Sequence, residues 1–494
     1  MRPHIRSLSR HLLAAGIACT SMLSAQAPRE ERARVAIDSM MRELVARNRF
    51  QGAVVVARGD QVVYRGGFGY ADRAAGVPFT PDTPTDAASI AKTFTAAGLL
   101  ELAREGRLRL DDQVTRWLPA FPYAGVRLRH LLVHAVGLPD YSYFDSLASP
   151  GDVRSNEGHL ALLARTRPPL PFRTGHGFSY DNLAYDLAAT VIERVSGQPY
   201  AEFMAARFFR PLQLTAFVRP ARFSAWNGTR TRGYQRTTDG VTDHDAYDLE
   251  GFYGADNIYL SANDLQRWVS GYRGVLRPPT VRAALAPGRL DDGRRTGITP
   301  GSWYSTNNGR QRYYSGHHNG FFSIAYIDEA AGISLAWVAN DAPPFWLQVG
   351  LTRALLALMD GRQPEPLVPR DLMAFAGDPS GSYQVPGIGT IGIHRQGEAM
   401  TVTLGGVRYD AFRVEPGLQY VPGLDAALRF TGSGGSPVLE WDTQLRRVSA
   451  PLINPRRRPP APAVPRRPPG PPSTESVATG VDRSAQMSPR VRGQ

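Results

Sequence analysis

The stretch Ser89-Ile90-Ala91-Lys92-Thr93-Phe94-Thr95-Ala96 decides the fold and the chemistry that we expect of this 494-residue chain. Lys92 is the only lysine in the sequence, whereas Lys and Arg together number 57. A buried lysine shifts its pKa readily and can accept a proton, but arginine stays charged in proteins. The chain therefore retains its one lysine at a place where a proton-accepting amine would be required.

Ser89 precedes Lys92 by three residues at the expected start of a helix over residues 89–102, so both side chains project from one face of the first turn. A serine Oγ at a helix start lies near free backbone N–H groups and the positive end of the helix dipole. That environment favours a nucleophile whose acyl intermediate carries an oxyanion. Two simpler interpretations stay open. Ser89 could be an ordinary helix cap. Lys92 could be a lysine that occurs by chance in a chain whose other cationic residues are arginines.

The spacing of hydrophobic residues around this helix predicts an α+β arrangement. Residues 29–48 have helical spacing, and two Val-rich runs within residues 51–70 predict a hairpin. A helix is expected over residues 183–196, ending at Gly197, and another from Ala262, followed by strands over residues 320–327 and 333–338. Because strands stand at both ends of this region, we expect one sheet completed by both ends.

The C-terminal part of the chain changes in composition. Residues 370–452 contain short β-rich runs separated by Gly-rich turns, which predict a separate small all-β domain, a sandwich or a barrel. From residue 453 onward Pro, Arg and Ser dominate, and we expect a disordered tail. We therefore divide the chain into a signal segment (1–25), a main domain (30–362), a β domain (370–452) and a tail (453–494).

The formal net charge of +13 belongs mostly to the chain ends. The first 25 residues contain three arginines and no acid, and residues 454–494 contain eight arginines and two acids, which leaves +4 for the body. We therefore expect no specific nucleic-acid partner, although the basic tail could contact anionic polymers or lipid headgroups.

The N-terminus has the pattern of a secretory signal. Arg2, Arg6 and Arg10 precede a mostly apolar stretch over residues 12–23, and small residues then favour cleavage after Ala25. The apolar stretch is too short to span a bilayer, so we expect an exported, periplasmic or secreted protein with no transmembrane segment. Cys19, the only cysteine, also fits a lipid-attachment site, but Gly16 stands where such sites usually carry Leu, which makes a lipid anchor the weaker interpretation.

The nucleophile stretch resembles that of the class C β-lactamase-like serine hydrolases, which include D-Ala-D-Ala carboxypeptidases, D-aminopeptidases and esterases. The resemblance runs in family order from about residue 32 to residue 360. It implies a β-lactamase/transpeptidase-like fold, with an antiparallel sheet flanked by helices and a helical region, and a lipocalin-like C-terminal β domain. Further stretches that carry it are Gly66–Asp72, Leu110–Asp112, Trp117–Pro119, His130–His134, Gly137–Tyr141, Phe178–Asn182, Val195–Gly197, Arg210–Leu212 and Leu260–Leu265.

The resemblance assigns catalytic roles to Tyr180 and Asn182. In the family the tyrosine shares the base role with the lysine, and a neighbouring ammonium would lower the pKa of a phenol from its ordinary value near 10. Tyr180 and Lys92 would then activate Ser89, and later the deacylating water, as a coupled pair. Asn182 would hold Lys92 and a substrate oxygen. The alternative interpretation of Tyr180 is a loop tyrosine packed on the core.

The third family element is expected at Tyr314-Ser315-Gly316, where the three residues would bind substrate. Gly316 would permit close backbone approach, so that the N–H groups of His317 and Ser89 form the oxyanion hole. β-Lactamases bind the carboxylate of the antibiotic through a cation at this position, and Tyr314 supplies none. This favours esters, amides or peptides over β-lactams as substrates. A register with His318-Asn319-Gly320 as the motif is the alternative that we disfavour.

We thus expect an exported serine hydrolase that acts through an acyl-enzyme on Ser89, without metal or cofactor, on a small-molecule or peptide substrate, peptidoglycan-derived ones included. His130 and His134 stand four apart, a metal-ligand spacing, but lack the glutamate of zinc peptidases. Two rivals remain: a penicillin- or wall-binding protein that acylates with little turnover, and a non-catalytic scaffold that binds through the β domain and the basic tail. The sequence leaves substrate identity and oligomeric state open.

Overall fold

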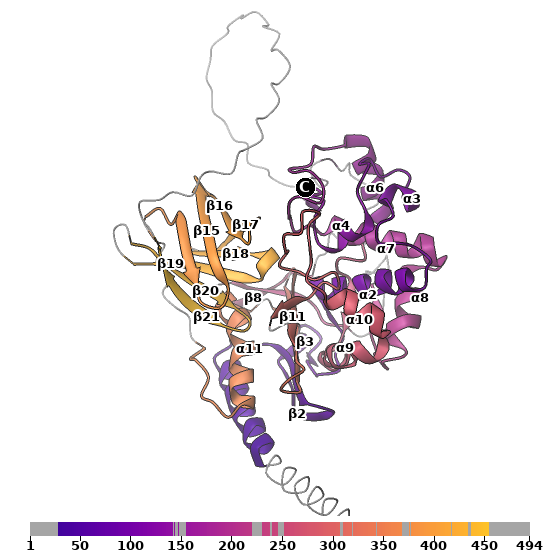
Figure 1. The fold of residues 1–494 in the computed structure, drawn as a ribbon. Helices are drawn as coiled ribbons and strands as arrows, with labels where there is room; N and C mark the ends of the chain where they lie inside the picture. Colours follow the sequence, from indigo (N-terminus) through magenta and orange to yellow (C-terminus); the bar gives the residue numbers. More distant parts are fainter. Residues whose placement is uncertain are drawn as a thin grey trace, which may run out of the picture.

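The computed structural model describes residues 28–453, apart from residues 142, 144–146, 148–154, 220–229, 238–239, 246–250, 307–309, 319, 342, 368–374, 376, 416 and 433–435 (Figure 1). The expected signal segment, Cys19 and the tail from residue 454 lie outside the described residues.

A six-stranded antiparallel sheet forms the centre of the main domain. Its strand order is β10-β11-β12-β13-β1-β2, and β1 pairs with β13 from Gly52↔Ala339 to Arg58↔Ile333. The two ends of the domain therefore complete one sheet, as the sequence predicts. The strands are β1 (Gly52–Arg58), β2 (Gln61–Phe68), β10 (Tyr304–Thr306), β11 (Gln311–His318), β12 (Phe321–Asp328) and β13 (Ile333–Ala339).

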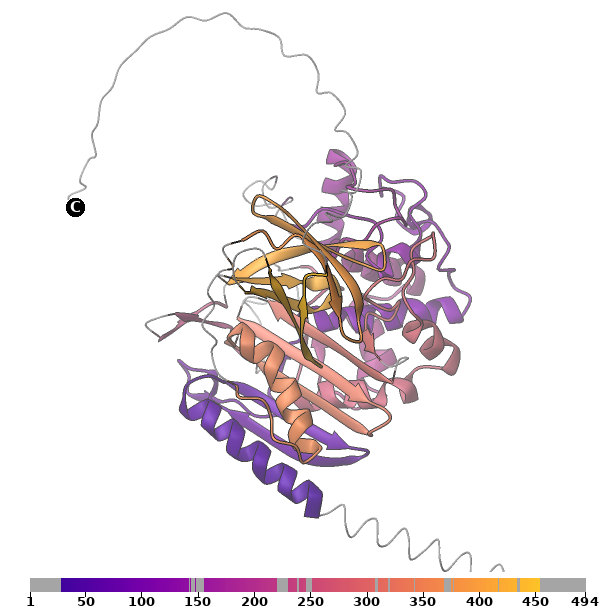
Figure 2. The same cartoon turned by 60° about the vertical axis from the view of Figure 1, so that its left-hand side comes forward.

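Helices cover both faces of this sheet. The N-terminal helix over residues 28–46 and α11 (Phe345–Met359) lie on one face, and α2 (Ala91–Arg104) and α9 (Ala262–Val275) lie behind the other (Figure 2). Phe94 of α2 stacks on Trp268 of α9 with ring centroids 3.8 Å apart. Because both faces are covered, β1 reads Ala-Val-Val-Val-Ala without the alternation of a half-exposed strand.

Further helices form a lobe beside the sheet. The predicted helix over residues 183–196 is α7 (Leu183–Ser196), which ends at Gly197 in the left-handed conformation. The other elements are α3 (Val114–Trp117), α4 (Leu128–Leu132), α6 (Asn156–Thr166), α8 (Tyr200–Met204), α10 (Pro278–Leu285), β3 (Tyr70–Asp72), β4 (Val77–Pro78), β5 (Thr85–Asp86), β6 (Phe217–Val218), β7 (Tyr234–Thr237), β8 (Gly240–Asp243) and β9 (Ile258–Leu260).

The C-terminal domain is an eight-stranded antiparallel sheet in sequential order that curls into a barrel. The first and last strands meet at a bridge between Tyr383 and Leu452, and the Ile453 N–H donates to the Ser382 carbonyl at 2.8 Å. The strands are β14 (Gly381–Val385), β15 (Gly389–Gln396), β16 (Ala399–Leu404), β17 (Val407–Glu415), β18 (Leu418–Val421), β19 (Ala426–Thr431), β20 (Val438–Thr443) and β21 (Arg447–Pro451).

The fold class predicted from the sequence is therefore confirmed: an α+β main domain is followed by a small all-β domain. Among the described residues, no helix has the length and apolar character needed to cross a membrane.

The barrel packs against the main domain at several points (Figure 1). Phe178 and Tyr409 place their rings 4.9 Å apart, and Phe345 at the start of α11 meets Tyr420 of β18 at 5.4 Å. Arg353 of α11 donates to Asp442 of β20 at 2.5 Å. These contacts place the short turn after β18 beside β11, where Ser315 of β11 donates a hydrogen bond to Asp425 of the turn.

Candidate active site

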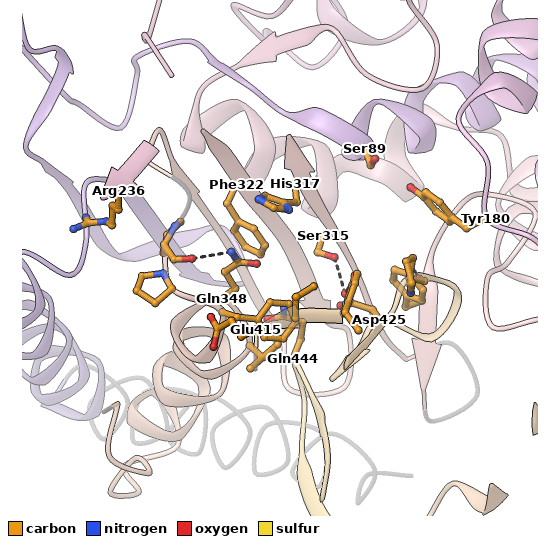
Figure 3. Close-up of a pocket in the computed structure, with 18 of the residues that line it drawn as sticks. Ser89, Tyr180, Arg236, Ser315, His317, Phe322, Gln348, Glu415, Asp425 and Gln444 are labelled. Carbon is orange, nitrogen blue, oxygen red and sulfur yellow. Dashed lines mark hydrogen bonds between the residues drawn. The ribbon is translucent and has the colours of Figure 1, made fainter. Parts of the chain in front are cut away.

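Ser89 lies in a short 3-10 turn (Ala88–Ile90) that leads directly into α2. Ala88 has φ 47°, a left-handed conformation that is costly for a residue with a Cβ, and its N–H donates to the Asp86 carboxylate at 2.8 Å. The N-cap of α2 is Ile90 and carries no side-chain cap. Ser89 therefore does not serve as a helix cap, and its hydroxyl is directed into a cavity instead (Figure 3).

Lys92 is fully buried in the first turn of α2. Its Nζ lies 3.0 Å from Ser89 Oγ, 2.8 Å from Asn182 Oδ1 and 3.0 Å from the Ala255 carbonyl. As an ammonium, Lys92 has one donor for each of these acceptors. As a neutral amine, it keeps two donors for Asn182 and Ala255, and its lone pair is left for the proton of Ser89.

Three buried carboxyl groups surround Lys92. Burial raises the pKa of Asp181 and of Asp256 to about 7 each, and raises that of Asp186 well above its ordinary value. The charge of Lys92 opposes all three shifts. A positive charge at position 92 therefore also stabilises the ionised forms of these three carboxyl groups.

Asn182 and Tyr180 reach the site from the segment that precedes α7. The Tyr180 hydroxyl points toward Ser89 and lies 3.1 Å from the hydroxyl of Tyr314, and Lys92 Nζ lies 5.2 Å from the centre of the Tyr180 ring (Figure 3). The structure thus brings Ser89, Lys92 and Asn182 into direct contact. Tyr180 lies beside them without a hydrogen bond to Ser89 or Lys92 among the described residues.

His134 supports Tyr180 from behind. The two rings stack with centroids 4.5 Å apart, and His134 Nδ1 accepts the N–H of Asp181 at 3.2 Å. Burial, together with the nearby charge of Lys92, holds the pKa of His134 well below its ordinary value, so the imidazole is neutral. His130 does not join His134 as the metal-ligand spacing would allow: its Nε2 lies 3.1 Å from Asp291 Oδ1.

The strand β11 brings the third element beside the nucleophile. A Cβ on Gly316 would lie 2.3 Å from the Ala87 carbonyl and 3.0 Å from the Ser89 nitrogen, so only glycine permits this approach. Gly320, from the alternative register, lies against Tyr234 instead. Tyr314 is buried behind the cavity wall, whereas Ser315 and His317 line it.

A cavity of about 690 Å³ opens in front of Ser89 (Figure 3). One wall belongs to the main domain and includes Tyr180, Asn182, Ser315 and His317. The opposite wall belongs to the barrel and contains Val414, Glu415, Tyr420, Pro422, Asp425 and Gln444.

Asp425 of the barrel contacts the third element directly. Its Oδ1 accepts hydrogen bonds from Ser315 Oγ at 2.9 Å and from the Tyr420 hydroxyl at 2.5 Å. Sequence reasoning missed the contribution of Asp425 and Tyr420, because a single Asp in a barrel turn carries no local signal of a partner 110 residues away.

Comparisons with known proteins show which proteins this chain is similar to. A family model described as Beta-lactamase matches residues 37–358. Penicillin-binding protein 4* of Bacillus subtilis is 35% identical over 176 residues, which cover 35% of this chain and 39% of that protein. Esterase EstB of Burkholderia gladioli is 36% identical over 208 residues, which cover 38% of this chain and 53% of the esterase. The chain thus spans about half or less of the length of these two relatives.

Solved structures share the fold. The octameric penicillin-binding protein homologue from Pyrococcus abyssi superposes with a TM-score of 0.59 at 21% identity, covering 84% of this chain and 99% of that one. The D-amino acid amidase from Ochrobactrum anthropi SV3 superposes with a TM-score of 0.56 at 24% identity, covering 67% of this chain and 99% of the amidase. The family model spans most of the chain, and its match agrees with the fold. On these grounds, the chain belongs to the Beta-lactamase family.

Proposed function

We propose that this protein is an exported serine hydrolase that forms an acyl-enzyme on Ser89. The observation that carries the proposal is the contact between the buried Lys92 and Ser89, with Nζ 3.0 Å from Oγ. Hydrogen bonds from Nζ to Asn182 and to the Ala255 carbonyl fix the amine against the serine. A nucleophile and a base held within hydrogen-bond distance are the arrangement that covalent catalysis requires.

In the acylation step, Ser89 Oγ attacks the substrate carbonyl while Lys92 accepts its proton. The bond to the leaving group breaks, and the leaving group takes a proton from Lys92; the Tyr180 hydroxyl, which points toward Ser89, would have to move closer to relay this proton. The negative charge that develops on the carbonyl oxygen is stabilised by the N–H groups of Ser89 and His317, since Gly316 lets β11 approach the backbone of Ser89. Water then attacks the acyl-Ser89 ester with the same groups in reversed roles.

The bond that is cleaved is an ester, an amide or a peptide bond to a D-amino acid. Support for this range comes from the relatives, which include a protein named as an esterase and a structure titled as a D-amino acid amidase. The absence of a cation at position 314 favours substrates without a carboxylate next to the reacting carbonyl, since Tyr314 is buried and bonded to Tyr180.

The test is turnover of a panel of p-nitrophenyl esters by the purified mature protein, with the Ser89→Ala variant measured beside it. Turnover that the variant lacks is the expected result. A burst of p-nitrophenol equal to the enzyme concentration without further turnover would favour a slowly deacylating wall-binding protein. Equal rates in both proteins would exclude Ser89 as the nucleophile and favour the scaffold.

Export is proposed from the N-terminal sequence, where three arginines precede an apolar stretch and small residues. Expression in a bacterial host followed by fractionation should place the protein outside the cytoplasm with a new N-terminus near residue 26. Full-length protein confined to the cytoplasm would contradict export.

A further inference from the structure

A second, smaller cavity adjoins the cavity in front of Ser89. Its volume is about 230 Å³, and the two cavities have Tyr180, Asn182 and Pro422 in common. The Tyr180 hydroxyl points toward Ser89, and Asn182 accepts a hydrogen bond from Lys92 (Figure 3). Because these shared residues lie beside the nucleophile, the two cavities form one cleft with Ser89 near their junction.

A turn of the barrel separates the two cavities. This turn is a 3-10 helix (Pro422–Leu424), in which Pro422 borders both cavities and Gly423 borders only the smaller one. A Cβ on Gly423 would lie 2.3 Å from the ring of Phe178 and 2.7 Å from the ring of Tyr409. The turn is therefore packed tightly between the main domain and the barrel, which fixes the wall between the cavities.

Aromatic side chains dominate the lining of the smaller cavity. Phe178 and Tyr409 are buried, and their ring centroids lie 4.9 Å apart. Phe412 of β17 also lines this cavity, yet its side chain is 57% exposed. Together with Tyr180, these residues present rings from both domains to the same space, which suits a flat apolar group.

The charge of the smaller cavity disfavours an anionic occupant. Asp140 and Asp410 contribute two carboxylates, and none of the described lining residues is cationic. Asp410 stands two residues before Phe412 on β17, so the two exposed side chains share one face of the strand. A group that carries a free carboxylate would be repelled from this wall.

The smaller cavity lies on the side of Ser89 where Tyr180 stands. The main cavity instead runs along β11, past Ser315 and His317 toward Arg236 (Figure 3). A substrate carbonyl at Ser89 therefore has one substituent in each cavity. The substituent that passes Tyr180 is the leaving group, because the proton that it takes up comes from the side of Lys92 and Tyr180.

We propose that the smaller cavity is the leaving-group subsite and that Phe412, supplied by the barrel, is a specificity-determining residue that packs against an uncharged aromatic leaving group. The inference rests on the proposed serine hydrolase and narrows its substrates to esters, thioesters or amides of aromatic alcohols, thiols or amines. In the acylation step the bond from the carbonyl carbon to this group breaks, and the group leaves through the smaller cavity with the proton that Ser89 gave up.

The test compares thioacetates whose leaving groups are alkanethiols of similar acidity: 2-phenylethyl, 2-cyclohexylethyl, ethyl and 2-carboxyethyl. Because Cys19 is the only cysteine, the mature protein from residue 26 onward has none, and dithiobis(nitrobenzoic acid) reports only the released thiol. We expect wild-type kcat/KM to be roughly ten- to a hundredfold higher for phenylethyl than for ethyl, the range for burying an aromatic side chain. Phenylethyl should exceed cyclohexylethyl by about two- to tenfold, and carboxyethyl should be slowest.

Phe412→Ala should lower the preference for phenylethyl over ethyl toward unity, and Phe412→Tyr should retain it because the ring remains. Tyr70→Ala is the matched control, since it removes an aromatic side chain that is 47% exposed and lies outside both cavities. Far-ultraviolet circular dichroism checks that each variant is folded. A wild type without preference for phenylethyl over ethyl or over cyclohexylethyl, or a folded Phe412→Ala with the preference intact, would overturn the proposal.

S-ethyl 3-phenylpropanethioate places the same ring on the acyl side. Its kcat/KM relative to S-ethyl thioacetate should be the same in Phe412→Ala and in wild type. A change in this ratio, with the preference among leaving groups intact, would assign the smaller cavity to the acyl part and overturn the proposal.

Turnover of S-ethyl thioacetate keeps this inference distinguishable from the proposed function. Turnover that disappears in Ser89→Ala tests the serine hydrolase alone. If this turnover is present and the phenylethyl preference is absent, only the leaving-group subsite is wrong. If none of the thioesters is turned over, the proposed function has failed, and the subsite fails with it.

Discussion

The contacts of Lys92 explain why its position is occupied by the only lysine of the chain. Its amine contacts the nucleophile, a side-chain amide and a main-chain carbonyl at 2.8–3.0 Å, a set of contacts that fits either protonation state. An arginine could retain the charge that the surrounding carboxyl groups require, but it could not accept a proton.

Lys92→Arg should therefore keep the protein folded and remove its activity. We expect kcat/KM for a p-nitrophenyl ester to fall by roughly 10²–10⁴, the range for loss of a general base. Arg116→Lys, an exchange of the same kind on an exposed side chain, should have no effect. Activity of Lys92→Arg within a few-fold of wild type would show that position 92 supplies charge only.

The buried carboxyl group of Asp425 lowers the stability of the fold when it is ionised. Burial raises its pKa from 3.8 to about 6, while hydrogen bonds from Tyr420, Ser315 and Tyr313 oppose the shift. The buried hydroxyl of Tyr304 also interacts electrostatically with this group. Because the folded protein binds this proton more tightly than the unfolded chain, the ionised carboxylate destabilises the fold above pH 6, and the cost vanishes below about pH 4.

Asp425→Asn should therefore increase the free energy of unfolding at pH 8 by about 1–3 kcal/mol and by much less at pH 4.5. Urea denaturation of both proteins at the two pH values measures the difference. An equal change at both pH values, or destabilisation at pH 8, would show that ionisation of Asp425 does not control stability.

At the scale of elements, β11 is positioned by the lack of a side chain at Gly316. The short β10 pairs only with residues 311–313 of β11, so the part of the strand next to Ser89 borders the cavity. In the structure β11 is second from the edge, because three residues of β10 add outside it.

Gly316→Ala should separate activity from folding. A Cβ there would meet the Ala87 carbonyl and displace β11 from Ser89, so kcat/KM should drop by about 10²-fold or more, as for loss of an oxyanion-hole donor. Gly392→Ala on β15 is the control, since its Cβ would meet Thr403 at an ordinary 3.5 Å. Unchanged activity in Gly316→Ala would contradict the assigned oxyanion hole.

Elements with a strong local signal were predictable, and elements without one were not. The helix over residues 183–196 was predicted at its observed bounds because its apolar face and Gly197 mark it. The turn at Ala88 contains no glycine, so its left-handed φ could not be predicted from the sequence. Helix α11 is buried along much of its length and lacks the amphipathic period that would have revealed it.

At the scale of the whole molecule, the site depends on contacts between domains that no local pattern encodes. The sequence predicted the barrel as a separate appendage, and it predicted Ser89 and Lys92 from three-residue spacing. The bond between Ser315 and Asp425 joins residues 110 positions apart, and it exists only because the barrel docks with its β18–β19 turn against β11.

Gly297 allows that docking, because a Cβ there would lie 2.2 Å from the Gly423 carbonyl in the barrel turn. Gly297→Ala should displace the turn and lower kcat/KM for a p-nitrophenyl ester, because barrel residues supply one wall of the cavity in front of Ser89. Gly274→Ala, which meets nothing within 4 Å, is the control. Equal kcat/KM in folded Gly297→Ala and in wild type would argue against a barrel that contributes to the site.

The most direct test of the account is the location of the covalent adduct. The protein is treated with a fluorophosphonate, digested with trypsin and analysed by mass spectrometry, with Ser89→Ala in parallel. Because Lys92 is the only lysine, cleavage after Arg73 and Lys92 yields the peptide 74–92, whose one serine is Ser89. We predict one adduct per chain on this peptide and none in the variant. An adduct elsewhere, or no adduct on folded wild-type protein, would contradict Ser89 as the nucleophile.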